Sequence, residues 1–416
     1  MEGHPPGGSG VWDSRLSRRR LLSMTGRGAA ALAAGGALSA CAAAEASVTV
    51  PLARQDRPVR WPVYKDNPAI ASGLEPEKGA TLQIYNWVAY INTATIKSFC
   101  KKYNCHAQVT TFNTMDEAIA KLQSGQLNFD IFIPTPDVLG PLILGKLIQP
   151  LNHSYIPNRH QTWPDYASPF YDVAAQYTMP YTVYTTGIGY RKDLVDQDPY
   201  RMANPWEMLW NPKYYGRTGI LDDYREALAL GMLKVGIHDV NSTSIAAIAE
   251  SRRQLQLCEK LTAAIIDNND FTDVPTGQTA VHHAWSGDMA SSWYYLPKGV
   301  KPDVLGYWYP QQGNGPVAND TMAVLRSSKS PVLSHLFINY FLDAHNALDN
   351  ASYTGYQQPI EGITPEAMVK AGIIPPSLLS TTVPRSYFRK GLFELELPAK
   401  TDQEYQVAWT TFGGGL

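Results

Sequence analysis

The sequence predicts an α/β protein in which two lobes, each built on a mixed sheet, are joined by a hinge of two chain crossings. Strand-like and helix-like segments alternate through the first part of the chain, a pattern typical of a mostly parallel sheet with helices on both sides. The β-prone run from Thr178 to Leu194 is long enough to leave one sheet and enter another, and "PVANDTMAVLRSS" predicts a second crossing. Two crossings between two α/β lobes imply a hinged clamshell.

The first lobe, which we assign to residues 79–185 and 322–350, opens with the clearest alternation. Strand, helix, strand, helix, strand and helix are predicted in turn for "TLQIYNW", "NTATIKSFCKKYN", "HAQVTTF", "TMDEAIAKLQSG", "FDIFIP" and "DVLGPLILGKL". Ala118, Ile119 and Leu122 make the second of these helices amphipathic. "FDIFIP" is almost wholly apolar, as a strand covered on both faces requires.

The second lobe, which we assign to residues 186–321, continues with both kinds of element. A helix and loop, a strand and two helices are predicted for "NPWEMLWNPKYYG", "RTGILDD", "YREALALGMLKVG" and "STSIAAIAESRRQLQLCEKLTAAI". "TAVHHAWSGDMASSWYYL" mixes strand and helix signals. Residues 351–416 are expected to form helical segments that pack across the lobes. Ligands of such sheets lie at the C-terminal ends of the strands.

Residues 1–40 predict a targeting signal instead of a folded element. "SRRRLLSM" places Arg18 and Arg19 before two leucines, which matches the twin-arginine export pattern. The Gly/Ala-rich run that follows is too short for a permanent membrane span and ends in "LSAC", which resembles a lipoprotein box with Cys41 as the lipidated residue. An ordinary signal peptide with Cys41 as a bystander is the alternative. Both imply export, to the periplasm or, with a lipid anchor, to the outer face of the cell membrane.

Residues 41–78 contain five prolines and little periodic apolarity. We interpret them as a linker between the lipid and the domain, packed in part on the domain surface. In an exported chain Cys100 and Cys105, five residues apart at a predicted helix end, can form a local disulfide. No metal site is expected, because no Cys/His pairs occur at ligand spacing and the adjacent His282 and His283 diverge by about 100° on a helix.

The composition excludes several classes of protein. The formal net charge is −2 and no basic cluster with interleaved aromatics occurs, which argues against a nucleic-acid groove. No G-x-S-x-G occurs, "TGIGYR" lacks the third glycine of a dinucleotide site, and the nine histidines stand in no recognisable catalytic setting. We therefore expect neither an enzyme nor a cofactor. Aromatic residues reach 11%, with 24 Tyr and 10 Trp, so rings are plentiful in a globular chain.

Six segments occur in an order that resembles one family. They are "IYNWVAY", "FDIFIPTPDVLGPLILGKLIQPL", "MPYTVYTTGIGYR", "WEMLWNPKYYGRTGILDDYREAL", "AWSGDMA" and "YTGYQQPI". Together they look like the spermidine/putrescine-binding proteins of bacterial ABC importers, from about Leu82 to the C-terminus. The resemblance implies a periplasmic-binding-protein clamshell that captures a polyamine between its lobes and delivers it to a membrane permease. A receptor for another organic cation, an amino-acid derivative, a sugar or chelated iron is the alternative, and we expect a monomer.

A polyamine site needs rings along the methylene chain and carboxylates at the ammonium groups. Trp87 and Tyr90 match the first aromatic pair of the family; packing on a lobe surface is the alternative. Val88 and Ala89 stand between them, where the family usually has Ser/Thr and an acid. Trp285 and Asp288 of "WSGD" match an expected ring-plus-carboxylate pocket, unless Asp288 is a helix N-cap.

Further acids extend the predicted site. Asp223 and Glu226 match the family's acidic pair, although D-x-x-E at a strand-to-helix junction is also a capping box, and Asp222 is an alternative cap. Thr135 and Asp137 follow the strand "FDIFIP". Asp137 departs from the family pattern, and it supplies a carboxylate on the rim where Ala89 removes one or else caps a helix.

The second crossing and the segment after it complete the candidate site. Asp320 lies in "GNGPVANDTMAV", where Ala318 replaces an aromatic residue that the family commonly has. Tyr356 and Gln357 of "GYQQP" are expected to touch a ligand terminus. Binding is expected to close the hinge near residues 184–189 and 319–322.

Overall fold

The computed structural model describes residues 50–125 and 128–413. The predicted export signal and Cys41 lie outside these residues. Val50–Leu416 form one compact unit, and everything below concerns that unit. Within the described residues, no helix combines the length and the apolarity needed to cross a bilayer.

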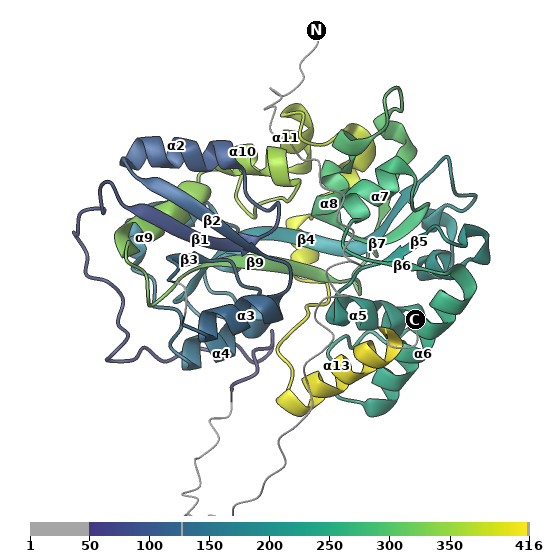
Figure 1. Cartoon of the computed structure of the whole chain (residues 1–416), viewed down its shortest axis with the longest axis horizontal. Helices are drawn as coiled ribbons and strands as arrows, with labels where there is room; N and C mark the ends of the chain where they lie inside the picture. Colours follow the sequence, from purple (N-terminus) through teal and green to yellow (C-terminus); the bar gives the residue numbers. More distant parts are fainter. Residues whose placement is uncertain (1–49, 126–127, 414–416) are drawn as a thin grey trace, which may run out of the picture. The chain divides into compact units, whose positions relative to one another are not determined.

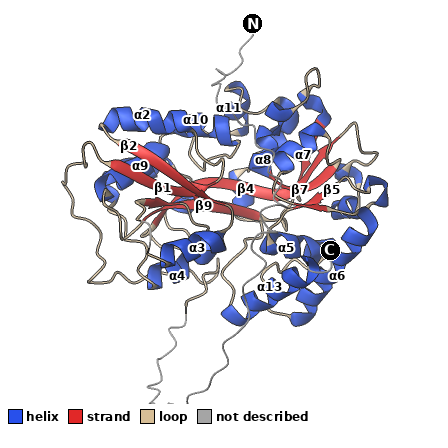
Figure 2. Ribbon diagram, viewed as in Figure 1, coloured by secondary structure: helices blue, strands red, loops and turns tan. Residues whose placement is uncertain are grey.

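Nine strands form a mixed sheet in the order β2-β1-β3-β9-β4-β7-β5-β6, and β8 pairs with β4 (Figures 1 and 2). The strands are β1 (Thr81–Trp87), β2 (His106–Phe112), β3 (Ile131–Phe132), β4 (Thr178–Arg191), β5 (Thr218–Ile220), β6 (Ile265–Ile266), β7 (Val281–Trp285), β8 (Leu305–Trp308) and β9 (Val317–Val324). β1 is parallel to β2 and β3, and β5 is parallel to β6 and β7.

The long strand β4 belongs to both halves of this sheet. Its first half pairs antiparallel with β9, ending at Thr185 opposite Val317. Its second half pairs antiparallel with β7, starting at Thr186 opposite Trp285, and with β8. β4 therefore changes partners between two adjacent residues, as a strand that leaves one sheet and enters another must. The predicted α/β class with two mixed sheets is confirmed.

Helices cover both faces of the sheet (Figure 2). They are α2 (Thr93–Tyr103), α3 (Met115–Gln123), α4 (Leu139–Leu144), α5 (Tyr224–Lys234), α6 (Ile245–Thr262), α7 (Asp270–Thr276), α8 (Ser286–Ser291), α9 (Pro331–Phe341), α10 (Ala344–Thr354), α11 (Pro365–Lys370), α12 (Arg385–Phe388) and α13 (Ala399–Gly413). Several begin where the sequence offers a capping oxygen: the side chains of Asn92, Thr114 and Asp343 accept backbone N–H groups of the first turn.

Two predicted helices are shorter or tighter than expected. "NPWEMLWNPKYYG" forms the 3₁₀ helices η6 (Pro205–Trp210) and η7 (Pro212–Tyr214), and "DVLGPLILGKL" forms the 3₁₀ turn η1 (Pro136–Val138) followed by the short α4. Each 3₁₀ segment starts with a proline, which fits the first turn but donates no hydrogen bond. Short proline-started segments of this kind favour 3₁₀ turns over long α-helices.

The described part of the predicted linker packs into the protein. Ala53, Val59 and Trp61 join the core cluster that contains Tyr85 and Phe112. Only 3% of the Trp61 surface is exposed, and its indole N–H donates to a backbone carbonyl oxygen over 2.7 Å. Residues 53–61 are therefore part of the folded domain. The exact lobe boundaries stay a prediction.

Cys100, Cys105 and Cys258 are free thiols, so the predicted Cys100–Cys105 bridge is absent from the structure. The two cysteines flank Asn104, the left-handed C-cap residue of α2. Burial raises the pKa of the Cys105 thiol to about 12. A side-chain hydrogen bond with Cys100 adds to this shift, so the two thiols lie close together and their oxidation to a disulfide stays a prediction.

Candidate functional site

The first part of the candidate site lies where β9 and β4 pair. Tyr90 follows β1, is buried, and donates from its hydroxyl to Asp320 Oδ2 over 2.6 Å. The same hydroxyl lies 2.6 Å from Thr182 Oγ1 on β4. Segments far apart in the sequence thus hold the predicted residues Tyr90 and Asp320 in direct contact, and Thr182, which sequence reasoning missed, completes the triangle.

Three tyrosine rings line this region, and we call Tyr90, Tyr184 and Tyr356 the tyrosine cluster. The Tyr356 ring meets the Tyr90 ring edge-to-face with centroids 4.7 Å apart, and the Tyr184 ring at 5.5 Å. Gly287 permits this position, because a Cβ added there would lie 2.3 Å from the Tyr356 ring. The cluster presents aromatic faces and edges beside a buried acid, which is chemistry suited to an alkylammonium group.

A second group surrounds Glu226 in the first turn of α5. Glu226 Oε1 accepts from the Trp285 indole N–H over 2.7 Å and from the Thr186 hydroxyl over 2.8 Å. Asp223 is the N-cap of α5 and accepts from the backbone N–H groups of Arg225 and Glu226. Asp223 therefore caps α5 as the capping-box pattern indicates, while the printed contacts of the Glu226 side chain are with Trp285 and Thr186.

Asp288 lies in the first turn of α8, next to the tyrosine cluster. The N-cap of α8 is Trp285, so the alternative in which Asp288 caps the helix is wrong. Burial raises the pKa of Asp288 to about 6. Hydrogen bonds with Asp270 and Tyr356 lower this pKa and so offset part of the effect of burial. The fully buried Asp270 of α7, which sequence reasoning did not single out, therefore belongs to the same neighbourhood.

Buried acids with incomplete hydrogen bonding dominate the electrostatics. Burial raises the pKa of Glu226 to about 7, and the charge of Asp223 adds to the shift. Burial likewise raises the pKa of Asp320 to about 7. Among the described residues, Glu226 Oε2 and Asp320 Oδ1 are buried oxygens without a hydrogen-bond partner. A buried carboxylate in this state either holds a proton or takes a cation.

Thr135 and Asp137 lie at the 3₁₀ turn η1. Thr135 is the N-cap of η1 but makes no side-chain cap bond, and Asp137 lies inside the turn, so the alternative in which Asp137 is an N-cap is wrong. Burial is the main cause of the raised pKa values of Asp320 and Asp223, and the charge of Asp137 adds to both shifts. Asp137 therefore adds negative potential to both acidic groups of the site.

The side chains of Trp87 and Gln357, which the sequence also assigned to the site, form hydrogen bonds with the backbone. The Trp87 indole N–H donates to the Ile133 carbonyl oxygen over 3.2 Å, and its ring packs against the same core cluster as Tyr90 and Trp285. Gln357 is buried: its side-chain N–H donates to a backbone oxygen, and its Oε1 accepts from the Val383 N–H over 2.8 Å. The Gln357 side chain thus joins two backbone segments.

Glu394 is a further acid that sequence reasoning missed. It lies between the buried Phe393 and Leu395, on the segment that joins α12 to α13. Its Oε1 is buried without a partner, and burial together with the charge of Glu226 raises its pKa well above the usual range. The alternation in "FELELP" was the available signal, since it predicts an extended segment with its glutamates on one face.

Comparison with known proteins places the chain in a family. The family model for bacterial extracellular solute-binding proteins matches residues 94–375. The chain is 26% identical over 314 residues to the putrescine/cadaverine-binding protein of Pseudomonas aeruginosa. These residues make up 74% of this chain and 88% of that protein. It is 25% identical over 289 residues to the spermidine/putrescine-binding periplasmic protein of Escherichia coli, covering 69% and 80%.

A solved structure supports the fold. The spermidine/putrescine ABC transporter substrate-binding protein of Streptococcus pneumoniae superposes with a TM-score of 0.64 at 22% identity, covering 80% of this chain and 99% of that one. The match of the family model extends over more than half of the sequence and includes most of the acids and rings described above. The chain belongs to the family of bacterial extracellular solute-binding proteins.

Proposed function

We propose that this protein captures a polyamine, of the putrescine or spermidine type, and delivers it to the permease of an ABC importer. The observation that carries the proposal is the pair of buried acids, Glu226 and Asp320, each with one unpartnered oxygen and each beside aromatic side chains. Ammonium groups would complete the hydrogen bonding of both acids, and the tyrosine cluster would pack along the methylenes between them. The names of the relatives point to the same class of ligand.

A ligand panel tests this proposal. Thermal unfolding and calorimetry with putrescine, spermidine, single amines, neutral amino-acid derivatives, sugars and chelated iron should select the diamine or triamine. At a ligand concentration of a hundred times Kd, mass action predicts about 2.7 kcal/mol of stabilisation. Glu226→Gln should weaken binding at least tenfold, while Glu75→Gln, at an exposed position, should not. Binding of a neutral solute alone would overturn the proposal.

Delivery to a permease also requires a place outside the cytoplasm, and the family description is that of extracellular proteins. We propose export by the twin-arginine signal at Arg18 and Arg19 and anchoring through lipidated Cys41, all outside the described residues. Cys41→Ala should release the exported chain from the membrane fraction, and replacement of both arginines by lysine should block its export. A Cys41→Ala chain that stays in the membrane fraction would contradict the anchor.

A further inference from the structure

His282 carries a ring nitrogen whose environment resembles that of a metal ligand. The His282 ring is fully buried, and Nδ1 lies 2.6 Å from the His283 carbonyl oxygen. Because a carbonyl oxygen only accepts, Nδ1 carries the hydrogen, and in the neutral ring Nε2 is left with a free lone pair. A histidine that ligates a metal commonly donates its other N–H to a backbone carbonyl in this way.

Two carboxylates face this nitrogen from other elements. Asp267 directly follows β6, and its Oδ1 lies 3.6 Å from His282 Nε2. Asp273 comes from the first turn of α7, is 5% exposed, and has a buried Oδ2 with no hydrogen-bond partner. His282 Nε2 likewise has no hydrogen-bond partner within the described part of the chain. One ligand atom from each of the three residues lies within 4.8 Å of the others.

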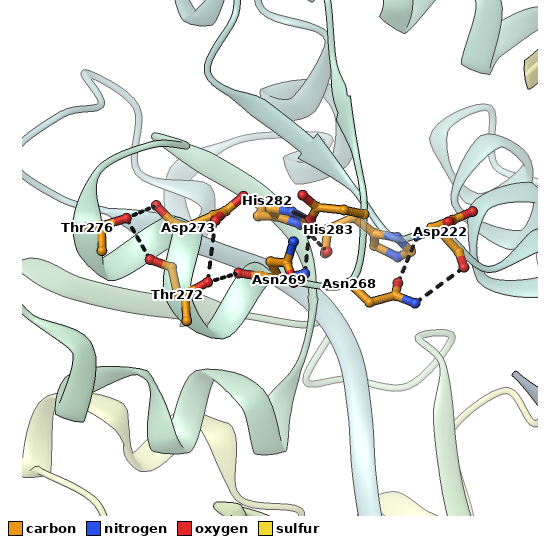
Figure 3. A network of polar contacts seen from close by, with 9 residues as sticks. Asp222, Asn268, Asn269, Thr272, Asp273, Thr276, His282 and His283 are labelled. Carbon is orange, nitrogen blue, oxygen red and sulfur yellow. Dashed lines mark hydrogen bonds and ion pairs between the residues drawn. The ribbon is translucent and has the colours of Figure 1, made fainter. Parts of the chain in front are cut away.

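The distance between Asp267 and His282 fits two ligands of one metal ion better than a direct hydrogen bond between the two side chains. The 3.6 Å between Asp267 Oδ1 and His282 Nε2 exceeds the range of a normal hydrogen bond. It is close to the separation of about 3.4 Å between two atoms that bind one tetrahedral Zn²⁺ at about 2.1 Å. Figure 3 shows His282, Asp273 and the neighbouring Asn269 within one polar network.

We propose that Asp267, Asp273 and His282 form a binding site for one divalent transition-metal ion, with Zn²⁺ as the expected occupant. One imidazole nitrogen with two carboxylate oxygens favours Zn²⁺ over Mg²⁺ or Ca²⁺, which prefer oxygen ligands. The Asp267 side chain is 18% exposed, so an ion and a water ligand can enter from its side. Gly219 provides room for the ring, because a Cβ there would lie 1.9 Å from it.

The site would join the end of β6, α7 and β7. The same helix α7 carries Asp270, which contacts Asp288 of the candidate polyamine site. A bound ion would thus hold β6, α7 and β7 together next to that site, and its binding would be independent of which solute the protein captures. The sequence led us to expect no metal site, with His282 and His283 on a helix, but both lie on strand β7. Neighbouring side chains of a strand point to opposite faces, so His283 takes no part in the proposed site.

Calorimetric titration of the chelator-treated full chain with ZnCl₂ tests the site. We expect one Zn²⁺ per chain, with weaker or no binding of Mg²⁺ and Ca²⁺. Asp267→Asn, at the partly exposed ligand, should weaken Zn²⁺ binding at least about tenfold. The matched control Asp303→Asn, at an exposed position, should leave it unchanged. Failure of the wild-type chain to take up Zn²⁺, or equal affinities of the two variants, would overturn the site.

A second readout avoids dependence on a variant that fails to fold. Co²⁺ bound to the wild-type chain should give the visible absorption of a low-symmetry nitrogen and oxygen site, and Zn²⁺ should displace it in a 1:1 ratio. His282→Gln should abolish this spectrum, whereas the exposed His345→Gln should retain it. A Co²⁺ spectrum that His282→Gln leaves intact would contradict the assignment.

Discussion

Glu226 and Asp320 set the energetics of the site at the level of single residues. Each has one oxygen held by hydrogen bonds and one buried oxygen without a partner. An uncompensated charge in such a place costs several kcal/mol, so a proton or a ligand cation must compensate it. The raised pKa values, about 7 for both residues, mean that each carboxylate takes up a proton more readily than an exposed one.

Affinity for putrescine should therefore depend on pH. Asp223 and Glu394 face Glu226 with like charge and Arg225 opposes them, while Asp137 acts on Asp320. The ligand cation binds the ionised acids, and below their raised pKa values it must displace protons. Affinity should rise from pH 5.5 to pH 8, by up to about tenfold per pH unit for each proton displaced. Calorimetric Kd values measure this; affinity that is constant or falls with pH would contradict it.

Gly287 provides a second prediction at this scale. Gly287→Ala would place a methyl group 2.3 Å from atoms of the Tyr356 ring and push the ring away from the tyrosine cluster. Overpacking of this kind typically costs about 1–3 kcal/mol. We expect lower thermal stability and weaker polyamine binding than for Gly413→Ala, where no atom lies within 4 Å of the added Cβ. Unchanged binding by Gly287→Ala would show that the Tyr356 ring position is not needed.

The sequence located several of these residues but not their contacts. Trp285 and Glu226 each stand in a recognisable motif, yet their hydrogen bond joins positions 59 residues apart and depends on side-chain direction. The D-x-x-E pattern fits both helix capping and ligand binding. Only the folded structure separates the roles, with Asp223 as the cap and Glu226 bonded to Trp285 and Thr186.

At the scale of elements, the segment between α12 and α13 contacts both halves of the fold. It runs beside β9, where the Leu392 N–H donates to the Gly315 carbonyl oxygen over 2.8 Å, and its Leu397 packs in the core with α5 and α6 (Figure 1). Arg54 donates to the Glu396 carbonyl oxygen over 3.0 Å. The segment itself, residues 389–398, lies beyond position 375, where the match of the family model ends.

This segment supplies Glu394, so we expect it to influence the choice of ligand. Glu394→Gln removes an acid that, when ionised, adds negative charge beside Glu226. The substitution should weaken binding of the trivalent spermidine about three- to tenfold, more than that of the divalent putrescine. Calorimetry with both amines measures the ratio, with Glu75→Gln as the control. An equal loss for both amines, or none, would assign Glu394 a structural role only.

Elements with strong periodicity were predictable, and short ones were not. The patterns that define β4 and α6 extend over 14 and 18 residues, long enough for burial to enforce one period. β3 has two residues and η6 begins at Pro205, so sheet pairing and proline geometry decide their form. Residues 53–61 seemed to lack periodicity, but Ala53, Val59 and Trp61 anchor them through tertiary packing.

At the scale of the whole molecule, β4 changes partners between Thr185 and Thr186, within the predicted hinge, and we expect the lobes to move there. Asp320 pairs with Thr182 in the β4–β9 ladder, and Trp285 pairs with Thr186 in the β4–β7 ladder. The two acidic groups of the site therefore belong to different halves of the sheet. A ligand that contacts both groups would hold the halves together.

Small-angle X-ray scattering should detect this closure. We expect a smaller radius of gyration with saturating putrescine than without it, and no change with a neutral solute of similar size. Asp320→Asn, which weakens contact with one half, should reduce the change at the same ligand concentration. Identical scattering curves for wild type with and without bound putrescine would contradict hinge closure on binding.

The alternation of strands and helices and the length of β4 sufficed to predict the two-sheet architecture. The site itself depends on contacts across that architecture, such as Tyr90 with Asp320, which are 230 positions apart. Periodicity carries no information on such pairs, because it reports which face of an element is buried and not what it meets. The sequence motifs named the residues, and the fold alone determines their partners.

Calorimetric titration with putrescine at pH 7.0, in two buffers with different ionisation enthalpies, tests most directly that buried acids receive the cation. The ammonium groups should take the place of protons on Glu226 and Asp320, so the observed heat should depend on the buffer and correspond to a net release of protons. Glu226→Gln and Asp320→Asn should each reduce that release. Tight binding of putrescine with no dependence on the buffer, at this pH and at pH 6.0, would contradict the account.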